Sequence, residues 1–266
     1  MVRVVIMGAC GRMGREIITV SSNDSDISIV GAVERSGVKY IGMDAGCVAG
    51  LESIGIGVCS ELDEVIERGD VIVDFTNSES SLRTVGTAAK HRKPVVLGTT
   101  GFSMEQLETI KEYTKQIPIL MSPNMSQGVN ILFHLVAKAA ELFGPEYDVE
   151  IVEIHHNLKK DAPSGTALRF GKLISEVRGK NIEDIGVFGR HGEIGKRNEE
   201  EIGIMALRLG DAVGDHTVIF GGQGERIEFT HRCSSRKNYA AGALRAAKFL
   251  VGKKRGLFGM DDVLGI

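Results

Sequence analysis

The sequence predicts an α/β protein: a Rossmann-like, doubly wound parallel sheet, plus an inserted α+β domain with a mixed or antiparallel sheet. In the first half of the chain, short apolar runs alternate with helical patterns, which is typical of a parallel sheet covered on both faces. In the second half, three strand patterns follow one another with no helix between them, which favours a sheet of different construction. A chain of 266 residues is long enough for two such domains.

The first half begins with an apolar run that ends at Gly8, the pattern of a buried strand. The expected strands are Val2–Met7, Ile27–Val33, Val71–Phe75, Pro94–Leu97 and Ile117–Met121. The expected helices are Arg12–Ser21, Ser60–Arg68 with Ser60 as its N-cap, Ser80–His91 and Ser103–Tyr113. The Gly-rich stretch from Val38 to Ile56 has weak periodicity, so we expect a loop there.

The pattern changes after Asn124. The expected helices are Ser126–Phe143, Ser164–Val177 and Ser235–Val251, and the expected strands are Tyr147–His155, Ile202–Leu209, Thr217–Phe220 and Arg226–His231. We expect a charged loop over Glu183–Glu200, a hairpin connection at Gly221–Gly224 and a short tail from Gly256. Because such a C-terminal helix often returns to the first domain, residues 1–125 and 236–266 are expected to form a dinucleotide-binding domain around an inserted domain of residues 126–235.

Composition excludes several classes of protein. Hydrophobic residues make up 42% and charged residues 25% of the chain, as in a folded, soluble protein. The net charge of −3 and the lack of a basic block make nucleic acid an unfavoured partner. No apolar run reaches the ~18 residues of a membrane span, and we expect a cytoplasmic protein. Four scattered cysteines without a C-x-x-C pair predict reduced thiols and no metal site.

A glycine-rich loop, Gly8-Ala-Cys-Gly11-Arg-Met-Gly14, follows the first strand and opens the first helix. This is the context that a dinucleotide fingerprint requires, although the spacing is G-x-x-G-x-x-G. Glycines let the backbone approach a pyrophosphate, and the helix N-terminus supplies partial positive charge. The alternative is a tight turn that only packs the helix on the strand.

Three further places that follow strands of the expected sheet favour a nicotinamide cofactor. Glu34 follows the second strand and stands where an acid binds the adenosine ribose, while Arg35 is suited either to a 2′-phosphate or to stacking on adenine. A surface ion pair is the alternative for these two residues. Gly98-Thr-Thr-Gly101 and Asp74-Phe-Thr76 also follow strands, and we expect them to contact the nicotinamide half; ordinary turns are the alternative.

The segment from Glu153 to Thr166 carries the strongest chemical signal. A strand ends at His155 and His156, and a helical pattern begins near Ser164 after Pro163. Histidine titrates near neutral pH, Lys159 and Lys160 add positive charge, and the N–H groups of Gly165 and Thr166 would form an anion site. The segment therefore predicts a proton donor beside a carboxylate clamp, with a solvated turn holding two incidental histidines as the alternative.

Motifs along the whole chain resemble the 4-hydroxy-tetrahydrodipicolinate reductase (dihydrodipicolinate reductase) family. The specific part is the run His155-His-x-x-Lys159-x-Asp-Ala-Pro-Ser-Gly-Thr166. The other matching motifs are Gly8–Gly14, Asp74–Thr76, Gly98–Gly101, Ser122–Asn124, Gly189–Gly192, Gly210–Asp211, Val213–Gly214, His216, Gly224–Arg226, Thr230–His231, Ser234–Arg236 and Gly256–Phe258. The resemblance implies an NAD(P)H-dependent oxidoreductase that forms tetrahydrodipicolinate in the diaminopimelate route to lysine. It also implies a homotetramer assembled through the sheet of the second domain, which would bind the substrate, a small dicarboxylate.

The resemblance also implies roles for single residues. His155 is the expected proton donor and Lys159 a second catalytic group, and which of them delivers the proton stays open. His156, Lys159, Gly165 and Thr166 are expected to bind the substrate carboxylates. NADH or NADPH is expected to contact Gly8, Ala9, Cys10, Gly11, Arg12, Met13, Glu34, Gly98, Thr99, Thr100, Ser122, Pro123, Asn124 and Met125, with Arg35 added by its position.

Two other functions fit parts of the sequence. One is another two-domain NAD(P)-dependent oxidoreductase, acting on a sugar or an aldehyde. An aldehyde dehydrogenase needs a nucleophilic cysteine in the second domain, where Cys233 is the sole cysteine. The other is a protein that binds NAD(P)H without catalysis, which would tolerate loss of His155 or Lys159, and both are present.

Overall fold

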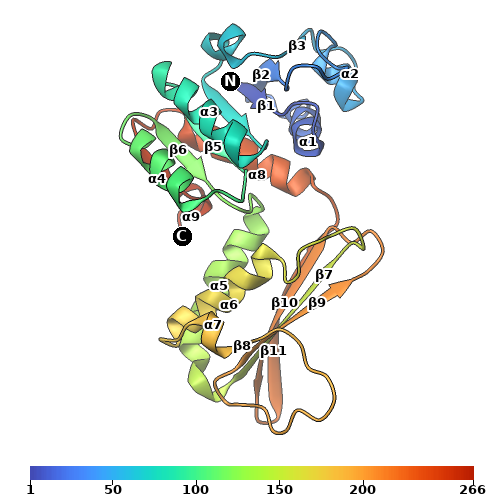
Figure 1. Ribbon diagram of the computed structural model, residues 1–266, viewed down its shortest axis with the longest axis vertical. Helices are drawn as coiled ribbons and strands as arrows, with labels where there is room; N and C mark the ends of the chain where they lie inside the picture. Colours follow the sequence, from blue (N-terminus) through green and yellow to red (C-terminus); the bar gives the residue numbers. More distant parts are fainter. The chain divides into compact units, whose positions relative to one another are not determined.

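The computed structural model describes all residues from Met1 to Ile266 and divides into two compact units (Figure 1). The first unit combines Met1–Gln127 with Arg236–Ile266, and the second is Gly128–Ser235. The chain therefore leaves the first unit once and returns to it. No helix is both long and apolar enough to cross a membrane.

The first unit contains a seven-stranded parallel sheet in the order β12-β6-β5-β4-β1-β2-β3. Its strands are β1 (Val2–Met7), β2 (Ile27–Val33), β3 (Val58–Cys59), β4 (Val71–Asp74), β5 (Val95–Leu97), β6 (Pro118–Met121) and β12 (Gly256–Phe258). Its main helices are α1 (Arg12–Ser21), α3 (Ser78–Lys90), α4 (Met104–Tyr113) and α8 (Lys237–Leu250). The strand order runs outward in both directions from β1, which confirms the predicted doubly wound fold.

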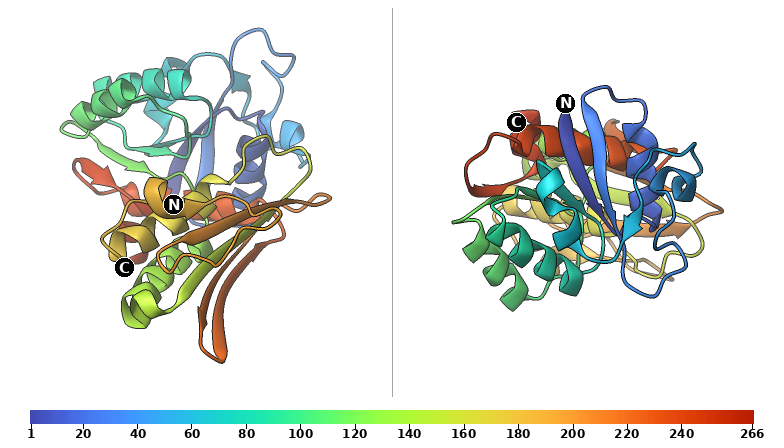
Figure 2. Two further views of the ribbon diagram at one scale, coloured as in Figure 1. Left: turned by 60° about the horizontal axis from the view of Figure 1, so that its bottom comes forward. Right: turned by 90° about the horizontal axis from the view of Figure 1, so that it is seen from above.

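Helices cover both faces of this sheet. Successive strand residues point to opposite faces; accordingly, Val4 and Ile6 lie in a core cluster with residues of α1 and α8, while Val5 lies in a second cluster with residues of α3 and α4. Figure 2 shows α3 and α4 on the side of the sheet away from α8. The near-continuous apolar strands of the sequence are explained by this burial on two sides.

The predicted helix over Ser60–Arg68 is wrong. The chain instead forms two 3-10 turns, η1 (Leu62–Glu64) and η2 (Ile66–Arg68), separated by Val65 with a φ of −127°. Glu61 holds the N-cap position and makes no side-chain capping bond, so Ser60 is not the cap. The helical spacing of Leu62, Val65 and Ile66 arises because all three side chains are buried against the sheet cluster.

The expected loop over Val38–Ile56 contains a short helix, α2 (Ala45–Ala49), and β3 follows it. Asp44 caps this helix, and its carboxylate accepts hydrogen bonds from five backbone N–H groups and the Ser53 hydroxyl. Burial raises the pKa of Asp44, but these donors outweigh it and hold the pKa well below its usual range. One side chain therefore fixes a segment that lacks periodicity.

The expected tail from Gly256 is also wrong, because it completes the sheet. β12 pairs in parallel with β6, and α9 (Met260–Leu264) follows with Met260 in the core. Both elements are too short to produce a period in the sequence.

The second unit contains a five-stranded mixed sheet in the order β11-β10-β7-β9-β8, as predicted. Its strands are β7 (Asp148–His155), β8 (Gly186–Val187), β9 (Ile202–Arg208), β10 (Gly214–Gly222) and β11 (Glu225–Cys233). β10 and β11 form the expected antiparallel hairpin, whereas β9 lies parallel to β7. The helices α5 (Gln127–Phe143), α6 (Gly165–Val177) and α7 (Ile182–Ile185) supply the core that packs on one face of this sheet.

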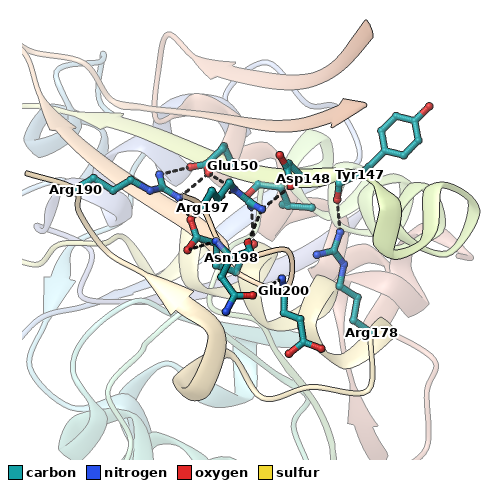
Figure 3. Close-up of polar contacts among 10 residues, drawn as sticks. Tyr147, Asp148, Glu150, Arg178, Arg190, Arg197, Asn198 and Glu200 are labelled. Atoms are coloured by element: carbon teal, nitrogen blue, oxygen red, sulfur yellow. Dashed lines mark hydrogen bonds and ion pairs between the residues drawn. The ribbon is translucent and has the colours of Figure 1, made fainter. Parts of the chain in front are cut away.

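The opposite face of β7 holds a network of ion pairs (Figure 3). Arg190 and Arg197 reach back from the segment between β8 and β9 to Glu150, and Arg190 also bonds Glu201. The charged loop that we predicted over Glu183–Glu200 is therefore a loop only after α7 and β8. Arg190 and Arg197 attach this remaining segment to the sheet through ion pairs.

Candidate active site

A pocket of about 750 Å³ opens in the first unit at the carboxyl ends of β1, β2 and β4. Five of the sequence-predicted cofactor residues line it: Gly8, Cys10, Gly11, Glu34 and Arg35. The other lining residues are Met7, Val33, Ser36, Val38, Tyr40, Ser60, Glu61, Leu62, Asp63, Phe75, Thr76, Asn77, Ser80, Arg83, Thr84 and Thr87. This edge of a doubly wound sheet is where such folds bind ligands.

The glycine loop is held against the second strand. The N–H groups of Gly8 and Ala9 donate to the Val33 carbonyl at 2.9 and 3.1 Å, and Gly8 has a φ of +72°. A Cβ on Gly14 would lie 2.3 Å from the Gly8 carbonyl oxygen, so only glycine lets α1 pack this close to the turn. Helix α1 begins at Arg12 without a side-chain cap, since its N-cap residue is Gly11. The turn therefore has the shape of a phosphate cradle.

Glu34 and Arg35 lie side by side at the pocket. The Glu34 carboxylate accepts the N–H of Cys10 at 3.1 Å and the N–H of Arg35 at 3.1 Å. Glu34 thus ties the glycine loop to the end of β2. Burial raises the pKa of the Cys10 thiol to about 11, with the Glu34 carboxylate adding to the effect. The neutral thiol of Cys10 is therefore favoured over the thiolate.

A chain of hydroxyl groups links the ends of β4 and β5. The Ser81 hydroxyl contacts Asp74 Oδ1 at 3.0 Å and Thr99 Oγ1 at 2.8 Å, and Thr76 also donates to Asp74. A Cβ on Gly98 would lie 2.1 Å from the Phe75 ring, so glycine is required there. Gly98, Thr99 and Thr100 do not line the pocket; they continue the same sheet edge next to it.

The loop after β6 continues this edge by one strand. The Ser122 N–H donates to the Leu97 carbonyl, and the Ser122 hydroxyl donates to the Asn124 carbonyl at 2.8 Å. Pro123 is exposed, whereas Met125 is buried in the core with 1% exposure. The Met125 side chain is therefore a packing group, and only its backbone is suited to contact a ligand.

In the second unit, His155 ends β7 beside a buried ion pair. Its Nδ1 lies 2.5 Å from Oε2 of Glu153, which is fully buried and is also bonded by both terminal nitrogens of the Arg208 guanidinium. Burial lowers the pKa of His155, and the Glu153 carboxylate offsets this only in part. Burial raises the pKa of Glu153, but bonds from Arg208 and His155 outweigh it and leave that pKa below its usual range.

Lys159 and His156 follow in the turn after β7. The Lys159 ammonium lies 2.8 Å from Asp161 Oδ2, while the Lys159 N–H donates to the His156 carbonyl. The His156 Nδ1 atom is buried without a hydrogen-bond partner. Lys160 is exposed and belongs to none of these contacts.

Helix α6 begins where this turn ends. Ser164 is its N-cap: the side-chain oxygen accepts the Ala167 N–H at 3.1 Å, and the backbone N–H donates to Glu153 Oε1 at 3.0 Å. Ser164 Oγ also lies 2.9 Å from Nε2 of the buried His216. Burial lowers the pKa of His216 to about 3, so this ring is neutral. Gly165 and Thr166, the first residues of α6, therefore lie close to the turn that carries Lys159.

Sequence reasoning missed several residues of both places. In the pocket these include Tyr40 on a loop, Asp63 in η1, and Arg83 and Thr87 on α3. Next to His155, no role was predicted for Glu153, Arg208 or His216, although Glu153 and His216 both belong to motifs that were noted in the sequence. The sequence did contain a signal for Glu153. It stands two residues before His155 on the same strand, so the two side chains point to the same face. Arg208 and His216 come from other strands, so their closeness to Glu153 and His155 depends on the sheet register.

Models of two families cover nearly the whole chain. "Dihydrodipicolinate reductase, N-terminus" matches residues 2–125, and "Dihydrodipicolinate reductase, C-terminus" matches residues 128–264. The chain belongs to the dihydrodipicolinate reductase family. It is accordingly an enzyme, an NAD(P)H-dependent oxidoreductase of lysine biosynthesis, as its motifs predicted.

Full-length relatives agree with this family. A 4-hydroxy-tetrahydrodipicolinate reductase from Syntrophus aciditrophicus is 46% identical over 265 residues, covering 100% of this chain and 99% of that protein. One from Burkholderia ambifaria is 47% identical over 264 residues, with 99% of each chain covered. Among solved structures, dipicolinate-bound dihydrodipicolinate reductase from Paenisporosarcina sp. TG-14 has a TM-score of 0.77 at 24% identity, over 98% of this chain and 99% of that one. This last likeness shows a shared fold.

Fold alone does not separate the family from other oxidoreductases. An amine dehydrogenase from Mycobacterium smegmatis also aligns over 98% of this chain, with a TM-score of 0.65 at 15% identity. The family is therefore decided by the sequence matches and not by the fold.

Proposed function

We propose that the reductase reaction uses His155 as proton donor, Lys159 and the start of α6 as the binding site for a cyclic dicarboxylate, and the pocket at Gly8 as the site for NADH or NADPH. The observation that carries the proposal is the turn from His155 to Thr166. Within it a histidine, a lysine and a capped helix start lie in one short segment. Dihydrodipicolinate reductase from Paenisporosarcina binds dipicolinate, a planar dicarboxylate of the same class.

The residues of the first unit fit a dinucleotide. The Gly8 turn and the uncapped start of α1 would hold the pyrophosphate, because N–H groups and the helix dipole favour an anion there. Glu34 and Arg35 would hold the adenosine end, and the loops at Gly98 and Ser122 the nicotinamide end. When bound, the nicotinamide supplies the hydride.

The residues of the second unit fit the substrate. Its two carboxylates require cationic or N–H-rich partners, which Lys159, His156 and the N–H groups at Gly165 and Thr166 would provide. Reduction of the conjugated imine leaves an enamine carbon that must gain a proton. His155 would hold that proton on Nε2, since its Nδ1 is engaged by Glu153.

The test is an absorbance assay at the NADPH band with enzymatically generated substrate. Wild-type protein should oxidise NADPH only when the substrate is present. His155→Ala should lower kcat by about 10²–10⁴-fold, the usual value of general acid catalysis, while NADPH affinity measured by titration stays nearly unchanged. A kcat within threefold of the wild-type value would rule out His155 as the donor. NADPH binding without turnover by the wild type would favour a protein that only binds the cofactor.

We also propose that apolar residues on the face of the second sheet opposite its helices assemble a homotetramer. Helices α5 and α6 pack on one face, whereas Val152, Ile154, Met205, Leu207 and Ile219 alternate onto the other. Leu207 is 49% exposed, and an open apolar sheet face is a typical site of association. Light scattering should give a mass four times the 28.7 kDa of the chain, and Leu207→Glu should reduce it; a wild-type monomer would contradict the proposal.

A further inference from the structure

A fully buried carboxylate next to the proposed proton donor has no part in the chemistry described so far. Glu153 points to the helix-covered face of β7, and its two oxygens accept four hydrogen bonds. The donors are His155 Nδ1, two nitrogens of Arg208 and the N–H of Ser164. A buried carboxylate costs several kcal/mol unless it is paired and bonded in this way.

The bond to His155 determines which ring nitrogen carries a proton. An ionised carboxylate only accepts hydrogen bonds, so His155 Nδ1 must bear a hydrogen at 2.5 Å from Glu153 Oε2. The neutral ring is then the Nδ1–H tautomer, and Nε2 is the nitrogen that gains and loses the proton. Nε2 lies over Gly214, where a Cβ would come within 2.9 Å of it. The absence of a side chain at Gly214 thus leaves room at the reactive nitrogen.

Arg208 balances the charge of Glu153. His155 and Arg208 are register partners on the parallel strands β7 and β9, which brings the guanidinium alongside the carboxylate. Arg208 donates at 2.9 Å to Oε2 and at 3.1 Å to Oε1, and it also donates to the Asp161 carbonyl at 2.7 Å. The pair therefore presents little net charge to the His155 ring while it fixes the turn that carries Lys159.

The remaining groups around His155 are known from the elements packed against it. His216 on β10 meets the ring edge-on at 5.2 Å between centroids and is neutral because burial lowers its pKa to about 3. Lys159 on the turn is cationic and is paired with Asp161. Glu153 is thus the single carboxylate bonded to the ring, and Arg208 is the cation that compensates it.

We propose that Glu153 and Arg208 form a positioning pair that fixes the tautomer and proton affinity of His155 and couples the donor to the start of α6. The coupling runs through Glu153 Oε1, which accepts the N–H of Ser164, the residue that caps α6. The pair would keep the proton donor and the carboxylate-binding turn in one fixed arrangement. This inference rests on the proposed role of His155 as the donor.

The two members of the pair have opposite effects on the donor. Replacing the carboxylate by an amide in Glu153→Gln leaves the Arg208 cation beside His155, which disfavours the protonated ring. Replacing the cation in Arg208→Gln leaves the Glu153 anion beside it, which favours the protonated ring. A group that only stabilised the fold would shift neither titration.

The experiment follows the His155 ring nitrogens by ¹H–¹⁵N correlation spectra of the full-length protein across pH. In the wild type the neutral ring should show Nδ1 protonated. Glu153→Gln should lose this tautomer preference and titrate at lower pH, whereas Arg208→Gln should titrate at higher pH. The fall of kcat/KM with rising pH should move in the same two directions, and kcat of Glu153→Gln near neutral pH should drop by about tenfold or more, within the loss caused by His155→Ala.

A matched control lies on the same strand. Glu150 also accepts two hydrogen bonds from one arginine, Arg190, but on the opposite face of β7. Glu150→Gln should leave the His155 spectrum and the pH profile unchanged. An unaltered tautomer and titration in Glu153→Gln, or equal shifts in Glu150→Gln, would overturn the inference. If His155→Ala kept full activity while the spectra behaved as expected, the donor role would fail and the positioning pair would stand. Glu153→Asp, which keeps the charge, should restore part of the wild-type profile.

Discussion

The Lys159 ammonium is bound by Asp161, two residues further along the same turn, at 2.8 Å. The Lys159 side chain is 19% exposed and that of Asp161 is 64% exposed, so the cation lies inward and its partner lies toward solvent. The hydrogen bond from Lys159 also lowers the pKa of Asp161. Asp161 thus holds the Lys159 ammonium in the turn before α6. In the proposed site, a substrate carboxylate would form an ion pair with the same ammonium.

Removing this cation should affect substrate more than cofactor. A hydrogen bond to a charged group contributes about 1.5–3 kcal/mol, so Lys159→Ala should lower kcat/KM by roughly 10- to 150-fold. The loss should include a higher KM, because a charge-assisted contact to a carboxylate disappears. Lys160→Ala is the control, since Lys160 is exposed and adjacent in sequence. Steady-state kinetics of the two variants provide the measurement. A larger loss of kcat/KM in Lys160→Ala than in Lys159→Ala would show that Lys160, and not Lys159, contacts the substrate carboxylate.

Cofactor choice should depend on Arg35. The Glu34 carboxylate already accepts two backbone N–H groups and is suited to ribose hydroxyls, while Arg35 adds a cation at the same pocket for a 2′-phosphate. We expect both NADH and NADPH to bind. Arg35→Ala should weaken NADPH by about 1.5–3 kcal/mol and NADH much less.

Isothermal titration of both cofactors provides the measurement. Lys39→Ala is a suitable control, because Lys39 is a nearby cation that lies over Tyr40 and does not line the pocket. Equal losses for NADH and NADPH in Arg35→Ala would show that the guanidinium stacks on adenine instead of binding phosphate.

The larger helices and strands could be predicted from the sequence because each has enough residues to show a hydrophobic period. The alternation from β1 to β6 and the hairpin β10–β11 both carry clear patterns. By contrast, α2, β3, β8, β12 and α9 have two to five residues each, too few to establish a period. Their positions depend on tertiary contacts, such as the hydrogen bonds to Asp44.

The same limit applies to the candidate site. His155 and Lys159 could be predicted as site residues because they lie in one continuous segment with the start of α6. Arg208 was not found, because its meeting with Glu153 depends on the register between β7 and β9. Met125 was itself predicted to contact the cofactor; its side chain belongs to the core, so the sequence could not show that any such contact must come from its backbone.

Gly203 should be needed for the ion-pair network on the outer face of β7. The Glu150 carboxylate lies directly over Gly203, and a Cβ there would be 1.8 Å from Glu150 Oε2. Gly203→Ala should force Glu150 away from Arg190 and Arg197 and cost about 1–3 kcal/mol, the usual range for overpacking. Gly221→Ala on β10 is the control, because no atom lies within 4 Å of its added Cβ. Urea denaturation should show a lower midpoint for Gly203→Ala alone; similar midpoints for both variants would mean that the network tolerates the added methyl group.

The same network should make stability depend on pH through Glu201. The hydrogen bond from Arg190 lowers the pKa of Glu201 in the folded protein, and the Glu201 side chain is only 16% exposed. Because the folded pKa lies below the unfolded value of about 4.3, this carboxylate contributes its full stabilisation above that pH. The contribution is lost as the pH falls through the folded pKa. Glu201→Gln should therefore lower the urea midpoint at pH 7, and the difference from wild type should shrink as the pH falls below about 4.3. A difference that stays constant or grows on acidification would show that Glu201 stabilises the loop through its shape and not through its charge.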